Sequence, residues 1–106
     1  MRFETKLIKD ILRAEYPDAR FHVRFCAAAQ YVDGSDKITI KSPISYNDLR
    51  TTMQHYTRGI CIFPKGMIAS RGGECKPEVL NPQTKEWVDF DLCEFIEVDS
   101  EVNHGR

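Results

Sequence analysis

Hydrophobic residues near the start of the chain recur with the period of a helix. Apolar side chains appear every three or four positions from Phe3 to Tyr16, and charged residues fill the positions between them. Pro17 stops the pattern, because proline cannot continue a helix. The spacing therefore predicts an amphipathic helix over residues 3–16.

The next two segments alternate with a period of two, which is typical of strands with one buried face. They are ARFHVRFC, residues 19–26, and DKITIK, residues 36–41. Asp33-Gly34 suits a turn between them if the strands extend that far. The inward positions are Phe21, Val23, Phe25, Ile38 and Ile40, and the outward positions are His22, Arg24, Cys26, Lys37, Thr39 and Lys41.

A second helix is expected over residues 46–58. Ser45 and Asp48 resemble a capping box at its start, and apolar residues follow at helical spacing until Gly59. The apolar run ICIFP, residues 60–64, then predicts a short buried strand.

The remaining pattern predicts a hairpin and a last strand. EVLNPQTKEWVDFDL, residues 78–92, alternates around a turn at Asn81-Pro82. The alternation falters at Glu94-Phe95, as a bulge would cause, and resumes over residues 96–99. We expect residues 100–106 to form a frayed tail.

The element order is thus α-β-β-α-β-β-β. It predicts a single α+β domain over residues 1–106, with two helices packed on one face of an antiparallel sheet. A length of 106 residues, 42% of them hydrophobic and 29% charged, suits one folded domain. No apolar run is long enough to cross a membrane and the first residues lack a signal peptide's apolar stretch, so we expect a cytoplasmic protein.

The four cysteines, the histidines and the glycines indicate no catalytic chemistry. The cysteines form no Cys-x-x-Cys pair, so we expect buried free thiols, with disulfides or a zinc site that includes His22 or His55 as alternatives. Phosphate-loop, nucleophile-elbow and zinc-protease motifs are absent from the sequence. We therefore expect a protein that is not an enzyme and needs no cofactor or metal. The cysteines are Cys26, Cys61, Cys75 and Cys93.

Charge is divided unevenly along the chain. Residues 1–73 carry 12 Lys or Arg and 7 Asp or Glu, whereas residues 74–106 carry 3 and 9, although the net charge is only −1. This division indicates a dipolar molecule, which either binds a charged partner or merely solvates two faces.

Basic residues fall on the outward phase of the first two strands. Cations on an open sheet face neutralise nucleic-acid phosphates, so these residues form a candidate DNA or RNA site, with a solvated basic face as the alternative. Tyr31 is the one obvious aromatic residue for base stacking there. The candidate residues are Arg24, Lys37, Lys41 and His22.

Acidic residues fall on the outward phase near the end of the chain. Asp89 and Asp91, and again Glu97 and Asp99, are two residues apart on a strand, hence about 6.6–7 Å apart. That spacing resembles successive phosphates, so the segment is a candidate mimic that binds a basic groove on another protein. Protection of an exposed strand edge is the alternative reading.

The first half of the chain resembles a large polyvalent protein-associated domain of phages and conjugative elements. The resemblance covers about residues 5–58. It rests on TKLIKDILRAEYPDARFHVRF, where Tyr16-Pro17 ends a helix before a strand, and on DKITIK with its following proline and helix. It implies an origin in a mobile element.

Together these patterns favour a small binding protein that inhibits a host nucleic-acid-handling defence complex, such as a CRISPR effector, by direct contact. The alternative is a DNA- or RNA-binding accessory domain that uses the basic sheet face. The expected partner is a bacterial host's defence protein or ribonucleoprotein, or nucleic acid, and no membrane.

Overall fold

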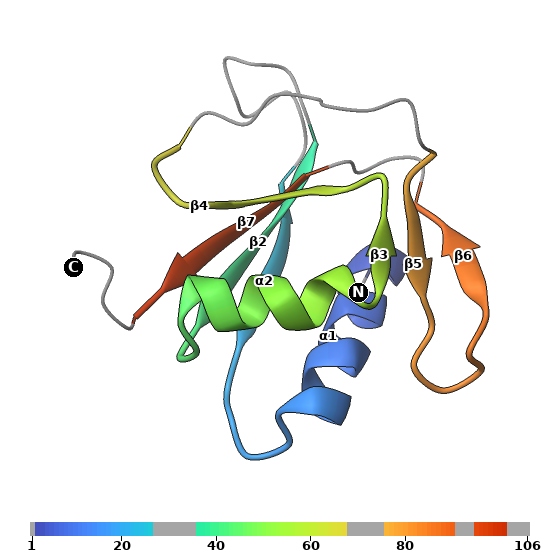
Figure 1. Ribbon diagram of the computed structural model, residues 1–106, viewed down its shortest axis with the longest axis horizontal. Helices are drawn as coiled ribbons and strands as arrows, with labels where there is room; N and C mark the ends of the chain where they lie inside the picture. Colours follow the sequence, from blue (N-terminus) through green and yellow to red (C-terminus); the bar gives the residue numbers. More distant parts are fainter. Residues whose placement is uncertain (1, 27–35, 68–75, 91–94, 102–106) are drawn as a thin grey trace.

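The computed structural model describes residues 2–26, 36–67, 76–90 and 95–101. Within these ranges lie two helices and seven strands, in the order α1-β1-β2-α2-β3-β4-β5-β6-β7 (Figure 1). The predicted α+β class is confirmed, and the predicted order matches roughly. The elements are α1 Phe3–Glu15, β1 His22–Cys26, β2 Lys37–Ser42, α2 Tyr46–Gln54, β3 Thr57–Arg58, β4 Cys61–Pro64, β5 Glu78–Leu80, β6 Trp87–Asp89 and β7 Phe95–Ser100.

The larger sheet has the strand order β1-β2-β7-β4. β1 and β2 pair antiparallel, but β7 runs parallel to both β2 and β4. This sheet is therefore mixed, which corrects the prediction of one antiparallel sheet. The helix α2 connects β2 to β4 and returns the chain so that these strands run the same way, and β7 fills the space between them.

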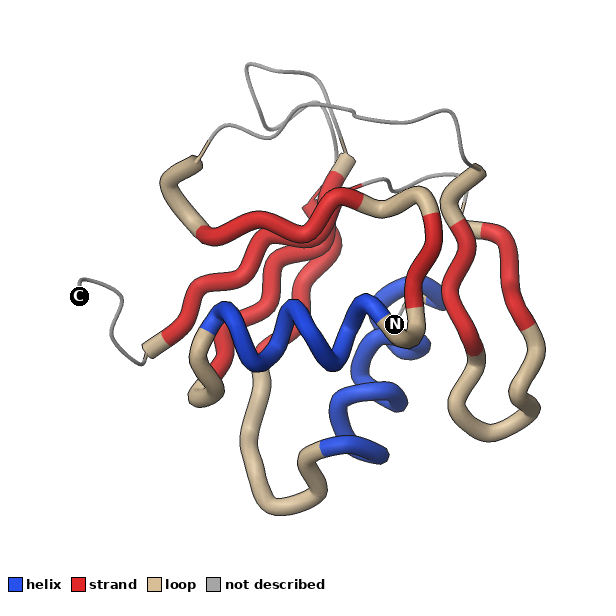
Figure 2. Tube along the Cα trace, in the orientation of Figure 1, coloured by secondary structure: helices blue, strands red, loops and turns tan. Residues whose placement is uncertain are grey.

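The remaining strands form a separate antiparallel sheet with the order β3-β5-β6 (Figure 2). Its β5 and β6 are the predicted hairpin, with Leu80 opposite Trp87. The side-chain oxygen of Asn81 accepts hydrogen bonds from the backbone N–H groups of Gln83 and Thr84, at 2.8 and 3.2 Å. This Asx-type turn explains why the hairpin reverses at Asn81-Pro82.

Both helices cover the same face of the larger sheet (Figure 1). The predicted apolar stripe of α1 and the inward residues of β1, β2 and β7 meet in one core. Val79 of β5 and Phe90, which follows β6, belong to the same core, so the small sheet shares buried contacts with the larger one. The buried cluster comprises Leu7, Ile8, Ile11, Leu12, Val23, Ile38, Ile40, Leu49, Met53, Val79, Phe90, Ile96 and Val98.

The second helix begins where the sequence predicts and ends earlier. The Ser45 hydroxyl accepts a hydrogen bond from the backbone N–H of Asp48 at 3.3 Å, which confirms the N-cap. The helix ends at Gln54, not at residue 58, because Thr57 and Arg58 pair with β5 as strand β3. The backbone carbonyl of Met53 accepts from the Thr57 hydroxyl, which closes the last turn of the helix.

Three residues tie the end of β2, the turn before α2 and the end of β7 together. The Ser42 hydroxyl accepts from the backbone N–H of Ile44 and donates to the carbonyl of Ile44, both at 2.8 Å. The Ser100 hydroxyl donates to that same carbonyl at 2.9 Å. Ser100 is therefore the last residue of β7 and not the start of the predicted tail, while residues 102–106 lie outside the described ranges.

Tyr56 links the start of the small sheet to α1 and makes the stability pH-dependent. Its hydroxyl donates a hydrogen bond to Glu15, and this bond, followed by desolvation and the Glu15 charge, raises the pKa of Tyr56 to about 12. Because the unfolded phenol ionises near 10, the stabilisation is complete below pH 10 and is lost as the pH rises to 12. The pair is largely solvated, so we expect a loss of no more than about 1 kcal/mol.

A comparison of wild type with Tyr56→Phe checks this expectation. Urea unfolding of the wild type should show a decline of the free energy of unfolding between pH 10 and 12 that is smaller in Tyr56→Phe. Tyr16→Phe removes a different phenol, which is hydrogen-bonded to Thr52 at 2.6 Å, and controls for the loss of a tyrosine. Equal declines in wild type and Tyr56→Phe would contradict the assignment.

Candidate nucleic-acid interface

Two of the four predicted acidic residues lie on the central strand β7. Glu97 and Asp99 do point to the outward face, as predicted, but β7 is paired on both sides and is not an exposed terminal edge. Glu97 forms an ion pair with Lys37 at 3.3 Å, and each side chain is only 15% exposed. Asp99 lies 3.5 Å from the amine of Lys65. Edge protection therefore does not explain these carboxylates.

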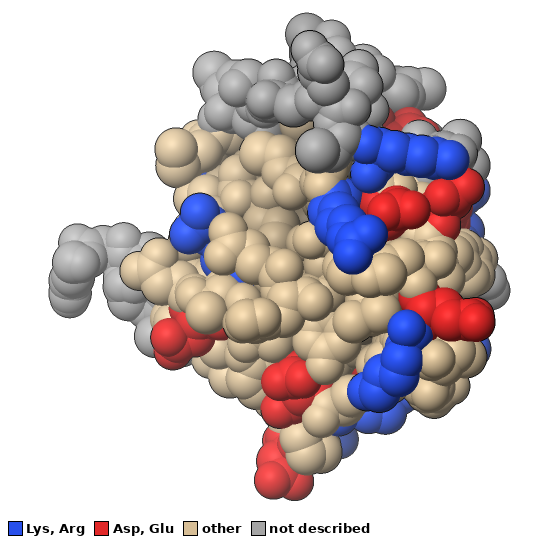
Figure 3. All heavy atoms as spheres, turned by 45° about the vertical axis from the view of Figure 1, so that its right-hand side comes forward, with Lys and Arg blue, Asp and Glu red and all other residues tan. Residues whose placement is uncertain are grey.

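The other two acidic residues do not extend this row in the part of the chain that the structure describes. Asp89 is on β6 in the other sheet, where it is exposed and forms an ion pair with Lys76 at 3.0 Å. Asp91 falls outside the described residues. On the side of the molecule shown in Figure 3, acidic and basic side chains adjoin one another and form no uniformly acidic surface.

The division of charge along the chain is largely neutralised by tertiary contacts. Acidic residues from the last third of the chain bond to cations from the first two thirds, as Glu78 does with Arg58 at 3.4 Å. The guanidinium of Arg58 also lies over the Trp87 ring, 3.7 Å from its centroid. The described structure therefore does not separate the charges into one basic and one acidic half.

Basic residues on β1 and the adjoining end of β2 are among those that form no ion pair in the described residues. His22 and Lys41 are direct cross-strand partners, and Arg24 lies next to them on the same face of the sheet. All three side chains are exposed, and in the described ranges none of them has an acidic partner within 4 Å. The structure thus brings three of the four predicted basic residues together and commits the fourth, Lys37, to Glu97.

Arg20 extends this set, although the sequence reading did not select it. It precedes β1 in the same outward phase as His22 and Arg24, two and four residues before them, and it is exposed. The period-two alternation of this segment could therefore have identified Arg20 from the sequence. We call Arg20, His22, Arg24 and Lys41 the β1 cationic surface.

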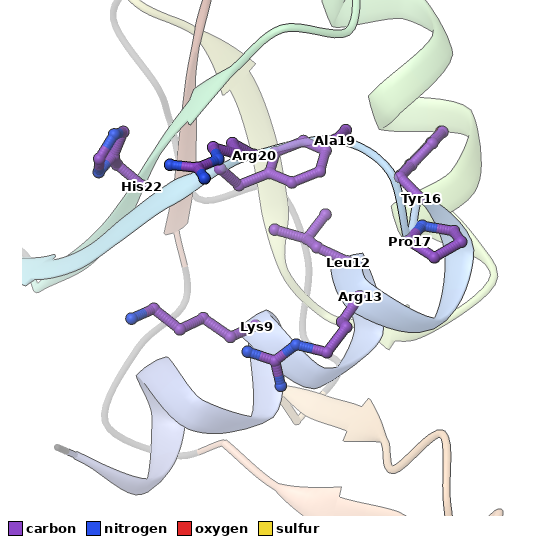
Figure 4. Close-up of a pocket in the computed structure, with 9 residues that line it drawn as sticks. Lys9, Leu12, Arg13, Tyr16, Pro17, Ala19, Arg20 and His22 are labelled. Carbon is purple, nitrogen blue, oxygen red and sulfur yellow. The ribbon is translucent and has the colours of Figure 1, made fainter.

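A pocket of about 370 Å³ adjoins this surface between α1 and the start of β1 (Figure 4). Lys9 and Arg13 enter it from α1, while Arg20 and His22 border it from the other side. Lys9 and Arg13 were not predicted, but their separation by four residues places them on one side of a helix. The pocket is lined by Lys9, Leu12, Arg13, Tyr16, Pro17, Ala19, Arg20, Phe21 and His22.

Aromatic rings form part of the pocket wall. Tyr16 and Phe21 are half-buried, with ring centroids 5.7 Å apart and planes tilted by 48°. The sequence reading assigned Phe21 to the core, but its place beside the edge strand β1 leaves part of it accessible. The predicted stacking residue, Tyr31, falls outside the described residues.

The cysteines that the structure describes are free thiols. Cys26 is buried, as expected for a free thiol, although the alternation had placed it on the outward phase of its strand; Cys61 is half-buried. Burial raises the pKa of the Cys61 thiol, which disfavours the reactive thiolate. Residues 2–26, 36–67, 76–90 and 95–101 contain no group of three or more His, Cys, Asp or Glu side chains arranged to hold a metal. Cys75 and Cys93 are outside these ranges.

Comparison with protein-family models, curated proteins and solved structures found no match to this chain. The resemblance to a large polyvalent protein-associated domain therefore stays a prediction. None of the described helices is both long enough and apolar enough to span a bilayer.

Proposed function

We propose that this chain is a non-enzymatic protein that binds single-stranded DNA or RNA through the β1 cationic surface. The observation that carries the proposal is that the Arg and Lys side chains of this surface have no acidic partner within 4 Å in the described structure, whereas Lys37, Arg58, Lys65 and Lys76 are each paired with a carboxylate. Such cations gain free energy when they replace the counterions of a phosphate backbone.

The geometry of β1 favours a single strand over a duplex. Arg20, His22 and Arg24 follow one another at every second position, hence about 6.6–7 Å apart along an extended chain. β1 is an edge strand, so one extended backbone has room to lie along it. An accessible aromatic ring beside the row, Phe21, adds the stacking component common in single-strand sites.

Inhibition of a host defence complex through the acidic residues remains a separate prediction. The ion pairs of Asp89, Glu97 and Asp99 reduce the negative charge that these residues offer to a partner. A mimic of successive phosphates requires that charge to be available. The unpaired β1 cationic surface therefore supports nucleic-acid binding better.

Replacing two cations of this surface tests the proposal. We expect Arg24→Gln/Lys41→Gln to weaken binding of a labelled oligonucleotide of about 12 nucleotides by roughly fivefold or more at low salt. The slope of log affinity against log salt should fall by about 1.4, because each lost phosphate contact removes about 0.7 for a single strand. Fluorescence anisotropy across a salt series measures both quantities.

A control with the same change in charge is available elsewhere on the molecule. Arg50 on α2 and Lys85 in the β5–β6 turn are exposed and lie outside the β1 cationic surface. Arg50→Gln/Lys85→Gln should leave the salt slope nearly unchanged. Equal weakening by both double variants would show that only net charge matters and would overturn the proposed site, as would an absence of binding by wild type.

A further inference from the structure

We propose that the α1–β1 pocket binds a nucleotide that carries a phosphomonoester, at the end of the strand that lies on the β1 cationic surface. This inference rests on the proposed function and names the part of the ligand that the pocket takes. A free mononucleotide has the same chemistry and is the second possible source of that group.

The shape of the pocket favours a terminal group. Its walls come from α1, from the start of β1 and from the residues that connect them, including Pro17 and Ala19. In Figure 4 this connection lies at one end of the space, and the charged ends of Lys9 and Arg20 lie toward the other. Because the connecting chain borders the first end, a strand that enters from the charged end would have to stop at that chain.

The charges of the pocket suit a phosphomonoester better than a phosphodiester. Lys9 and Arg20 have no acidic partner within 4 Å in the described ranges. Arg13 forms an ion pair with Asp10 at 3.4 Å. Asp10 is also bound by Lys6 at 2.9 Å, so its negative charge is offset. A terminal phosphate carries about −1.5 to −2 charges at neutral pH and offers three acceptor oxygens to such cations.

The apolar part of the pocket suits a base or a sugar. Leu12, Tyr16 and Phe21 line this part, and the two rings have centroids 5.7 Å apart. The Tyr16 hydroxyl shares a 2.6 Å hydrogen bond with Thr52 of α2, which fixes the position of that ring. A volume of about 370 Å³ lies within the range of roughly 300–1,000 Å³ that is typical of small-molecule sites.

The pocket and the β1 cationic surface form one continuous path. His22 lines the pocket and is also the cross-strand partner of Lys41. A strand whose last phosphate binds between Lys9 and Arg20 would place its next phosphates near His22 and Arg24. Binding of the strand end in the pocket would therefore set the position of the following phosphates along the β1 cationic surface.

The test compares oligonucleotides that differ only at their ends. Otherwise identical labelled strands carry a 5′-phosphate, a 3′-phosphate or only hydroxyl groups, and anisotropy gives the affinity of each. We expect wild type to bind one phosphorylated strand about tenfold more tightly than the hydroxyl strand. This preference corresponds to about 1.4 kcal/mol. Lys9→Gln/Arg20→Gln should reduce the ratio of the two affinities to near one.

The ratio separates this inference from the proposed function. Arg24→Gln/Lys41→Gln should weaken all the strands and preserve the ratio, since these residues lie outside the pocket. If wild type binds all ends equally, the pocket inference is overturned while the proposed function stands. If no strand binds, both the proposed function and the strand-end site are overturned.

A mononucleotide titration distinguishes the free ligand from the strand end. Adenosine and uridine monophosphates are added to the ¹⁵N-labelled protein, and amide shifts are followed for residues 9–22. Saturable shifts in wild type that are absent in Lys9→Gln/Arg20→Gln, without binding of any oligonucleotide, would assign the pocket to free nucleotides. Shifts that are the same in the variant would contradict the pocket inference.

Discussion

Phe90→Ala is expected to lower the free energy of unfolding by about 3–5 kcal/mol. Phe90 is 1% exposed and is among the largest fully buried side chains. Its backbone N–H also donates to the carbonyl of Pro77 at 2.9 Å, which holds the main chain at this position. Loss of the ring leaves a cavity that the β3-β5-β6 sheet and the helices would have to close.

The result also decides whether the two sheets unfold together. Phe90 follows β6 of the small sheet but packs in the cluster that includes α1 and β2. Small domains have a free energy of unfolding of about 5–15 kcal/mol, so this loss would leave the whole chain marginal. Urea unfolding, monitored by circular dichroism and by Trp87 fluorescence, should therefore show one coincident transition shifted to lower urea.

Phe3→Ala is the matched control, because it removes the same ring from a side chain that is 52% exposed. We expect it to change the free energy of unfolding by less than about 1 kcal/mol. If Phe90→Ala changes only the fluorescence transition and leaves the circular dichroism transition in place, the small sheet is not part of a shared core.

Ser42→Ala is expected to cost about 1–3 kcal/mol, although it removes only one oxygen atom. Ser42 is fully buried, and its hydroxyl both accepts from and donates to the backbone of Ile44. Without it the Ile44 N–H loses its partner at the point where β2 turns toward α2. The carbonyl of Ile44 retains its hydrogen bond from Ser100, so the loss remains partial.

Thr51→Ala provides the comparison for this substitution. Its hydroxyl donates to the carbonyl of Asn47 at 3.0 Å within α2, but the side chain is exposed. Water replaces that partner, and alanine favours the helix, so we expect a change within about 0.5 kcal/mol. Denaturant unfolding of both variants measures the difference. Equal effects would show that the Ser42 network adds nothing beyond an ordinary surface hydroxyl.

The sequence by itself determined most of the elements and the faces that they bury, although it did not indicate β3. The apolar stripe of α1, the Ser45 cap and the turn at Asn81 are local features, and each is present where the pattern predicts it. The same holds for the alternation of Ile38 and Ile40 with lysines on β2. These features depend on neighbours within a few residues, so periodicity and turn chemistry were sufficient.

Only the tertiary structure decided how the strands are ordered and which charges remain free. The insertion of β7 between β2 and β4 is a long-range pairing, and no local pattern specifies the partners of a strand. That insertion places Glu97 beside Lys37, so two residues that were predicted to serve different partners neutralise each other. Lys41 also lies opposite Asp99 in the register of β2 and β7, but the Asp99 carboxylate is 3.5 Å from Lys65 and forms no ion pair with Lys41.

The α1–β1 pocket was beyond sequence reasoning for the same physical reason. The pattern placed Lys9 on a helix and Arg20 in a strand segment, but it could not specify the packing of α1 against β1 that brings them to one pocket. Phe21 was correctly assigned to the inward phase, yet its accessibility depends on the strand order, because only an edge strand leaves such a ring partly open. The local sequence determined these side chains, and the packing of distant segments determined their common site.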